Sequence, residues 1–228
     1  VALAYGHGCA RPRAPGLLAF RRRRAMIERV SPVVGVLSLV LITIIWGTTF
    51  VVVKEALDTI PVALLLALRF TLAGAMLAWA KFERKAIVPA LILGVLSFSG
   101  FASQTIGLSI TSASNAAFIT GLSVILTPLL GAMFWGKRLA PRVFLAAGIA
   151  LAGLALMTLR DGVASVNAGD VWVLLTALTY ALYIVYLGEV AGKVRATSLV
   201  MMQHIPMALL AWLWALPQVS LLPSVPLG

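Results

Sequence analysis

The chain has 228 residues, of which 61% are hydrophobic and only 11% are charged, whereas soluble domains carry about 25% charged residues. This composition indicates a polytopic membrane protein surrounded by the lipid bilayer. The formal net charge of +11 does not indicate a nucleic-acid partner, because seven of the eighteen cations precede residue 30 and most others lie in short connectors, as is typical of membrane topology.

Residues that carry covalent or metal chemistry are scarce in this sequence. Cys9 is the single cysteine, His7 and His204 are far apart, and the seven acids all fall in connectors, tails or helix ends. The sequence thus offers no intrachain disulfide, no cluster of metal ligands and no pair of carboxylates at membrane depth. We expect no catalytic residue, no metal and no cofactor, and we do not interpret the chain as an enzyme.

Residues 1–32 form the first segment of the chain. They contain a run of four arginines at 21–24 and no apolar stretch long enough to cross a bilayer. A secretory signal would need a short apolar core and a cleavage site, whereas the apolar run after Arg29 is of full spanning length. We expect residues 1–32 to be a basic, disordered cytoplasmic tail, or residues 1–25 to be upstream sequence translated in error, with Met26 as the candidate start.

From residue 33 onward, apolar runs follow one another with short connectors between them. A bilayer core about 30 Å thick needs roughly 20 apolar residues in a helix. The pattern therefore predicts an all-α, polytopic membrane helix bundle of about seven transmembrane helices. The predicted spans are 33–53, 61–80, 87–109, 115–135, 142–159, 170–187 and 198–217.

The basic residues of the connectors predict the orientation of these spans. Seven lysines and arginines precede the first span, and the following connectors hold one, three, none, three, one and two. Cytoplasmic loops are enriched in lysine and arginine, so the alternation predicts a multi-pass protein of the cytoplasmic (inner) membrane with its amino terminus in the cytoplasm. A rhodopsin-like receptor would have its amino terminus outside, and the charge pattern argues against that class.

Arg69 is the one charged residue that the sequence places deep in the membrane. It follows Pro61, at the outer end of the second span, by about 12 Å of helix. Burying an arginine there costs from about 3 to more than 10 kcal/mol, so its guanidinium should find acceptors. The alternatives that remain open are a contact to an anion or carboxylate in a transport path, and a structural arginine. The structural arginine would bond backbone carbonyls or Gln104, or would snorkel toward water at the helix end.

The third and fourth spans contain the other polar candidates. Small and hydroxylated residues crowd the third span, and we interpret most of them as tight helix packing. Gln104 is the exception, because an amide in hydrocarbon needs partners, and we expect it in a cavity wall. In the fourth span, Asn115 is expected to cap the outer end, Thr120 lies on a small polar face, and Pro128 is expected to kink the helix.

Two further polar or aromatic side chains lie within predicted spans. Trp46 lies in the middle of the first span rather than at an interface, so we expect its indole N–H to bond a neighbouring helix or to line a pocket. His204 lies in the seventh span, and we interpret it as a hydrogen-bonded packing residue rather than a proton relay.

Several stretches of the chain resemble the EamA branch of the drug/metabolite transporter superfamily. They are "WGTTFVVVKEAL" in the first span, "LRFTLAGAMLA" in the second, and "SASNAAFITGLSVILTPLLGAMFWGKRL" with "FLAAGIALAGLALMTLRDG" in the fourth and fifth. The resemblance covers residues 33–162 as one five-helix repeat. It continues at "GDVWVLLTALTYALYIVY", so residues 163–228 correspond to the first two helices of a second repeat in inverted orientation.

The resemblance implies a ten-helix carrier with a central cavity that opens alternately to each side. An odd number of helices per repeat inverts the second repeat, in agreement with the lysine and arginine count. The chain departs from the family in two ways. It has Gly136, Lys137 and Arg138 where the family usually has an acid, and it stops after the seventh span, so three helices of the second repeat are missing.

The sequence thus predicts a secondary transporter that moves a small metabolite, an amino acid or a toxic compound by alternating access. The alternative is a truncated, non-transporting membrane scaffold or product, for which a partner or a homodimer would have to complete the fold. The residues expected near the solute path are Trp46, Arg69, Gln104, Asn115 and Thr120.

Overall fold

The computed structural model describes residues 32–136, 141–160 and 167–219. The chain divides into two compact units, Val1–Trp46 and Gly47–Gly228. In the first unit the described residues open helix α2 (Pro32–Ala56), which runs on into the second unit. The expected tail before Pro32, the pair Lys137 and Arg138, and the expected repeat boundary at 162/163 lie outside the described residues.

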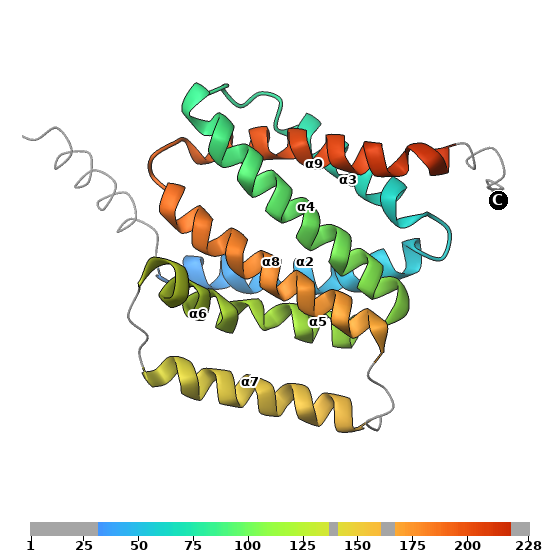
Figure 1. The fold of residues 1–228 in the computed structure, drawn as a ribbon, viewed down its shortest axis with the longest axis vertical. Coiled ribbons are helices and arrows are strands. Elements are labelled where there is room, and N and C mark those ends of the chain that lie inside the picture. Colours follow the sequence, from blue (N-terminus) through green and yellow to red (C-terminus); the bar gives the residue numbers. More distant parts are fainter. Residues whose placement is uncertain (1–31, 137–140, 161–166, 220–228) are drawn as a thin grey trace, which may run out of the picture. The chain divides into compact units, whose positions relative to one another are not determined.

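The described part of the second unit is helical (Figure 1), and its one β-bridge is isolated, between Ala191 and Val194. This confirms the predicted all-α membrane bundle. After α2, the helices are α3 (Val62–Met76), η1 (Arg84–Ala86), α4 (Ile87–Ile110), α5 (Ala113–Gly121), α6 (Ser123–Trp135), α7 (Pro141–Arg160), α8 (Ala168–Val190) and α9 (Ala196–Val219).

Every one of the seven predicted spans is helical in the structure. Among the described residues, five helical stretches are long and apolar enough to cross a bilayer, and α5 and α6 together count as one of them. Helix α3 has 15 residues and is shorter than the predicted second span. Many large apolar side chains on these helices face outward, as a lipid environment permits.

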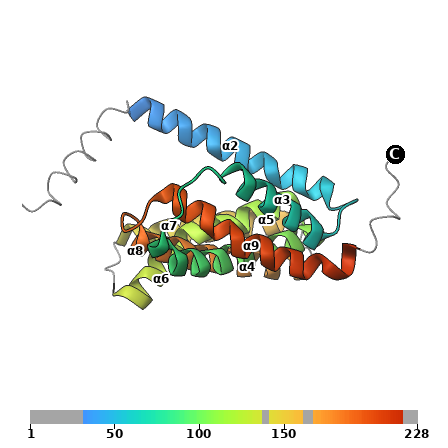
Figure 2. The same cartoon turned by 90° about the horizontal axis from the view of Figure 1, so that it is seen from above.

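Helix α4 lies at the centre of the second unit. It packs against α8 and α9, as both views show (Figures 1 and 2), and also against α3 and α5. Glycines let the helices approach closely: a Cβ atom at Gly107 would lie 2.5 Å from Val173 Cγ2 and 2.6 Å from the Gly169 carbonyl oxygen. Close packing is therefore the role of this small residue, as the sequence predicted.

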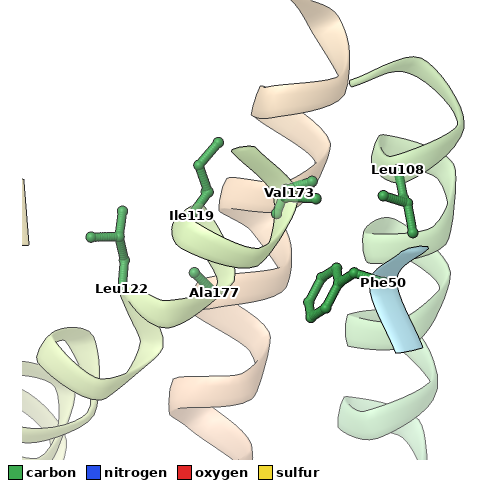
Figure 3. Close-up of a cluster of buried hydrophobic side chains, with 7 residues drawn as sticks. Phe50, Leu108, Ile119, Leu122, Val173 and Ala177 are labelled. Atoms are coloured by element: carbon green, nitrogen blue, oxygen red, sulfur yellow. The ribbon is translucent and has the colours of Figure 1, made fainter. Parts of the chain in front are cut away.

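Apolar clusters hold α4 and its neighbours together. In one of them, Phe50 and Leu108 face side chains of α5 and α8 (Figure 3), and Val173 and Ala177 in this cluster are fully buried. Another joins α3 to α9, where Phe70 and Met207 are each 2% exposed. These clusters fix α3, α4, α8 and α9 around the middle of the bundle.

The predicted fourth span is interrupted, but not where the sequence indicated. The break between α5 and α6 lies at Leu122, where Leu122 N–H donates to the Ile119 carbonyl in a tight i to i−3 bond. Helix α6 then runs through Pro128 without a second interruption. The predicted bend at Pro128 stays a prediction, and the helix is continuous through the proline.

The start of the same span also differs from the prediction. Ser112, not Asn115, is the N-cap of α5, and the Ser112 hydroxyl oxygen accepts a hydrogen bond of 3.1 Å from Asn115 N–H. Asn115 lies inside the first turn, so its side chain is past the position from which it could cap the helix. The Ser112 hydroxyl thus satisfies the backbone N–H of Asn115 itself, which is one of the free N–H groups of the first turn.

Candidate functional site

Arg69 lies in the middle of α3, next to the buried Phe70. Its guanidinium carbon is 4.9 Å from the centroid of the Phe101 ring on α4, which is a cation–π distance. Within the described part of the chain it forms no hydrogen bond and no ion pair, so neither Gln104 nor a carbonyl receives its N–H groups. The side chain is half-buried, and its five donors remain open to an acceptor from outside the protein.

Tyr180 on α8 is the second polar group at this depth. Its ring meets Phe101 in a T-shaped contact at 5.6 Å, and the residue is only 9% exposed. The hydroxyl is buried and has no hydrogen-bond partner among the described residues. A buried unpartnered hydroxyl costs about 1–3 kcal/mol, so its position calls for an explanation.

Gly100 creates the space that the Tyr180 ring occupies. A Cβ atom at Gly100 would lie 2.3 Å from Tyr180 Cε1, which no packed structure tolerates. Because the ring fills the gap over the glycine, its orientation is fixed by packing and not by its hydroxyl. The hydroxyl is therefore held in place next to Phe101 without a protein partner.

An aromatic row extends from this point toward α9. Phe70 lies 5.5 Å from Phe101, Phe98 lies 6.5 Å from Phe70, and Trp214 lies 6.4 Å from Phe98, all in edge-to-face contacts. We call Tyr180, Phe101, Phe70, Phe98 and Trp214 the aromatic row. It gives the region around Arg69 apolar walls from four helices.

Gln104 and Thr120, both predicted from the sequence, are brought together by α4 and α5. Gln104 Nε2 donates to Thr120 Oγ1 at 3.1 Å, and that hydroxyl donates to the Ala116 carbonyl at 2.7 Å. Both side chains are buried, at 7% and 3% exposure. The amide and the hydroxyl satisfy each other in the membrane, and the pair joins the two helices.

The other two predicted residues are Asn115 and Trp46. Asn115 is half-buried in the first turn of α5, and no hydrogen bond in the described residues joins it to Arg69. Trp46 belongs to the first unit, and the other four candidates belong to the second. Sequence analysis missed Tyr180, although a tyrosine in the middle of a long apolar span was a signal that could have identified it.

A family model for the EamA-like transporter family matches residues 33–159. The chain belongs to the EamA-like transporter family. It is 28% identical to an uncharacterized transporter of Archaeoglobus fulgidus over 195 residues. This aligned region covers 85% of the chain and 62% of the relative. It is 34% identical to a probable amino-acid metabolite efflux pump of Escherichia coli K12 over 152 residues. That aligned region covers 64% of the chain and 48% of the relative.

The chain therefore spans between about half and three fifths of the length of these relatives. No solved structure gives a significant match. All five predicted residues of the EamA-like chain lie in the matched range, whereas Tyr180 lies after it. Membership of the family and the apolar helices together identify a multi-pass membrane protein.

A second polar cluster of the EamA-like chain lies where α4 ends and α8 begins. Lys54, in the last turn of α2, donates from Nζ to the carbonyls of Leu108, Ser109 and Thr111 at 2.7, 3.2 and 3.0 Å. These carbonyls have no partner within α4, and a cation is favoured at a helix carboxyl end. Lys54 thus completes the end of α4.

Asp170 completes the start of α8 in the same cluster. Its carboxylate accepts from the Thr111 hydroxyl at 2.5 Å and from Asn167 N–H at 3.1 Å, while Asn167 caps the helix by accepting from Gly169 N–H at 2.8 Å. We call Lys54, Thr111, Asn167 and Asp170 the capping cluster. The sequence signal for it was the Asn–x–x–Asp spacing of a capping box.

Proposed function

We propose that this EamA-like chain is part of a secondary transporter that moves a small organic solute across the cytoplasmic membrane by alternating access. The observation that carries the proposal is Arg69, a charged side chain in the middle of α3 with no hydrogen-bond acceptor among the described residues. A charge at that depth is costly unless a ligand or a wet cavity uses it. The activity involves no covalent step, so the chain is not proposed to be an enzyme.

The transporter is proposed to consist of ten helices in two inverted repeats. Residues 33–162 would form the first five-helix repeat, and 163–228 would begin the second. Support comes from the family match, which ends at residue 159, and from relatives that are longer than this chain. A homodimer is the other arrangement that would supply further helices, and the amino terminus is proposed to be cytoplasmic on the lysine and arginine count.

The E. coli relative and the site support a proposal for the solute class. That relative is named a probable amino-acid metabolite efflux pump, so we propose amino acids and related metabolites as solutes of this chain. Arg69 would contact the solute, while Gln104 and Thr120 would hold α5 against α4 beside the path. Trp46 and Asn115 are retained as proposed path residues, and rocking about the Leu122 interruption would let α6 move.

Flux measurements with purified protein test the proposal. The chain is reconstituted in liposomes that are loaded with radiolabelled phenylalanine, leucine or glutamate, and efflux is compared with protein-free liposomes. We expect faster efflux of at least one solute and its loss in Arg69→Met, with Arg84→Met as a matched control in the connector. Efflux equal to that of protein-free liposomes for all solutes, from monomeric and crosslinked protein alike, would contradict transport by this chain.

A further inference from the structure

Arg69 and Tyr180 leave two polar groups unpartnered beside one aromatic ring. The Arg69 guanidinium lies 4.9 Å from the Phe101 centroid, and the Tyr180 ring meets the same Phe101 at 5.6 Å. Both side chains therefore contact the same ring. One is a cation and the other is a hydroxyl, and in the described part of the chain neither has a hydrogen-bond partner.

We propose that Arg69 and Tyr180 form a binding site for the carboxylate of a solute that has an apolar or aromatic body. The guanidinium would donate two parallel hydrogen bonds to the carboxylate, and the Tyr180 hydroxyl would donate a third. A charge-assisted pair of this kind satisfies both protein groups and the ligand at once. The inference rests on the proposed transport function and specifies the solute that it moves.

The charge at the site favours a carboxylate over a phosphate. Every other lysine or arginine in the described ranges lies in a connector or in the first or last turn of a helix. Arg69 is thus the one cation that these ranges place at mid-membrane, and it balances a single negative charge. A phosphate, which carries nearly two charges at neutral pH, would remain partly uncompensated in a medium of low dielectric.

The neighbouring side chains favour an apolar body for the same ligand. The aromatic row continues from Phe101 through Phe70 and Phe98 to Trp214, and these rings offer edges and faces but no carboxylate or amine. Near the far end of the row, Trp212 Nε1 donates to Thr71 Oγ1 at 2.9 Å, so that indole is already satisfied. Ring-to-ring contacts would therefore hold the rest of the solute.

Packing makes the site rigid before a ligand binds. The Tyr180 ring fills the gap over Gly100, and Phe70 is buried in the cluster that joins α3 to α9. Neither side chain has to lose much rotamer freedom on binding, which lowers the entropic cost of recognition. Gln104 does not compete for the ligand or for Arg69, because Thr120 already accepts from its amide.

Calorimetric binding with two isosteric probes tests the site. The full chain in detergent is titrated with 3-phenylpropionate, a carboxylate, and with 3-phenylpropionamide, its neutral amide. We expect the acid to bind at least about tenfold more tightly, which is what one charge-assisted hydrogen bond of about 1.5 kcal/mol gives. Equal affinity for the acid and the amide would overturn the proposal.

Two variants with a matched control locate the binding groups. Arg69→Met should abolish the preference for the acid, and Tyr180→Phe, which keeps the ring and its packing, should weaken binding of the acid about fivefold. Tyr183→Phe is the control, because the Tyr183 hydroxyl donates to Gln203 Oε1 and lies on the same helix. Unchanged acid binding in Tyr180→Phe, even where Arg69→Met fails to fold, would overturn the proposal.

Two further outcomes separate this inference from the proposed function. Inorganic phosphate that displaces the acid at similar concentration would show a general anion site and would overturn the carboxylate assignment. Binding is measured without flux, so a chain that binds the acid and moves no solute contradicts transport only. Flux of solutes that shows no preference for the acid over the amide contradicts the carboxylate site only.

Discussion

The capping cluster and the Arg69–Tyr180 site both place polar groups inside an apolar bundle, but only the groups of the capping cluster have hydrogen-bond partners among the described residues. In the capping cluster Asp170 accepts two hydrogen bonds and Lys54 donates three. At the other site the guanidinium and the hydroxyl have no hydrogen-bond partner in the described residues. Satisfied groups stabilise helix ends, whereas unpartnered groups cost stability unless a ligand supplies the missing partner.

This comparison predicts its largest effect for Asp170→Ala. The variant removes the acceptor of the Thr111 hydroxyl and of Asn167 N–H, so both donors lose their partner at the start of α8. We expect the free energy of unfolding to fall by about 2–4 kcal/mol. Unfolding in mixed SDS and detergent micelles measures the change, with Asp58→Ala in the exposed turn after α2 as the control. If Asp170→Ala lowered the free energy of unfolding no more than Asp58→Ala, the claim that the capping cluster stabilises the start of α8 would be wrong.

Gly100→Ala is expected to have the next largest effect, now in the region of the open site. The added methyl group would lie 2.3 Å from the Tyr180 ring, so α4 and α8 would have to separate. Overpacking of this kind costs about 1–3 kcal/mol. The same unfolding assay measures it, and Gly188→Ala is the control, because nothing lies within 4 Å of the Cβ that it adds. If the two variants were equally stable, the packing account of Tyr180 would be wrong.

Thr120→Val tests a second satisfied pair at greater depth. It removes the hydroxyl that accepts from Gln104 Nε2 and leaves that buried amide without this partner. We expect a loss of about 1 kcal/mol, because the valine keeps the shape and only the hydrogen bond is lost. Thr59→Val in the exposed turn after α2 should change the unfolding midpoint by less than the error of the assay. A neutral Thr120→Val would show that the pair contributes little.

Tyr180→Phe is expected to have the smallest effect on stability. It compares most directly a hydroxyl without a hydrogen-bond partner with one that has a partner. The variant deletes a hydroxyl that has no partner, so the free energy of unfolding should stay the same or rise by up to about 1 kcal/mol. The matched Tyr183→Phe loses a hydrogen bond of 3.2 Å and should be slightly less stable than the parent. Clear destabilisation by Tyr180→Phe would mean that the hydroxyl has a structural partner.

The sequence predicted the helices better than it predicted the polar contacts. All seven spans are helical, because runs of apolar residues report directly on what can lie in a bilayer. The role of Asn115 was wrong, since a cap depends on which residue of several lies just outside the first turn. The interruption at Leu122 was not predicted, because contacts with neighbouring helices decide where a helix breaks, and the bend at Pro128 stays a prediction.

The candidate residues show the same limit. Gln104 was expected to need a partner, and it has one in Thr120, but the sequence alone did not pair them. Arg69 was correctly recognised as the charge that needs an explanation, while its neighbour Tyr180 was not named. The partner of a side chain on another helix depends on how the helices cross, and local sequence patterns contain no information on that angle.

Because Gly100 and Tyr180 approach so closely, the space available to a side chain at one position depends on the residue at the other. A side chain can grow at 100 only if the residue at 180 shrinks, so we expect Tyr180→Leu to recover part of the stability that Gly100→Ala loses. The double variant would then fold without the ring or the hydroxyl. Among relatives of this chain, residues at these two positions should therefore vary together, and the pair should indicate which relatives can recognise a carboxylate.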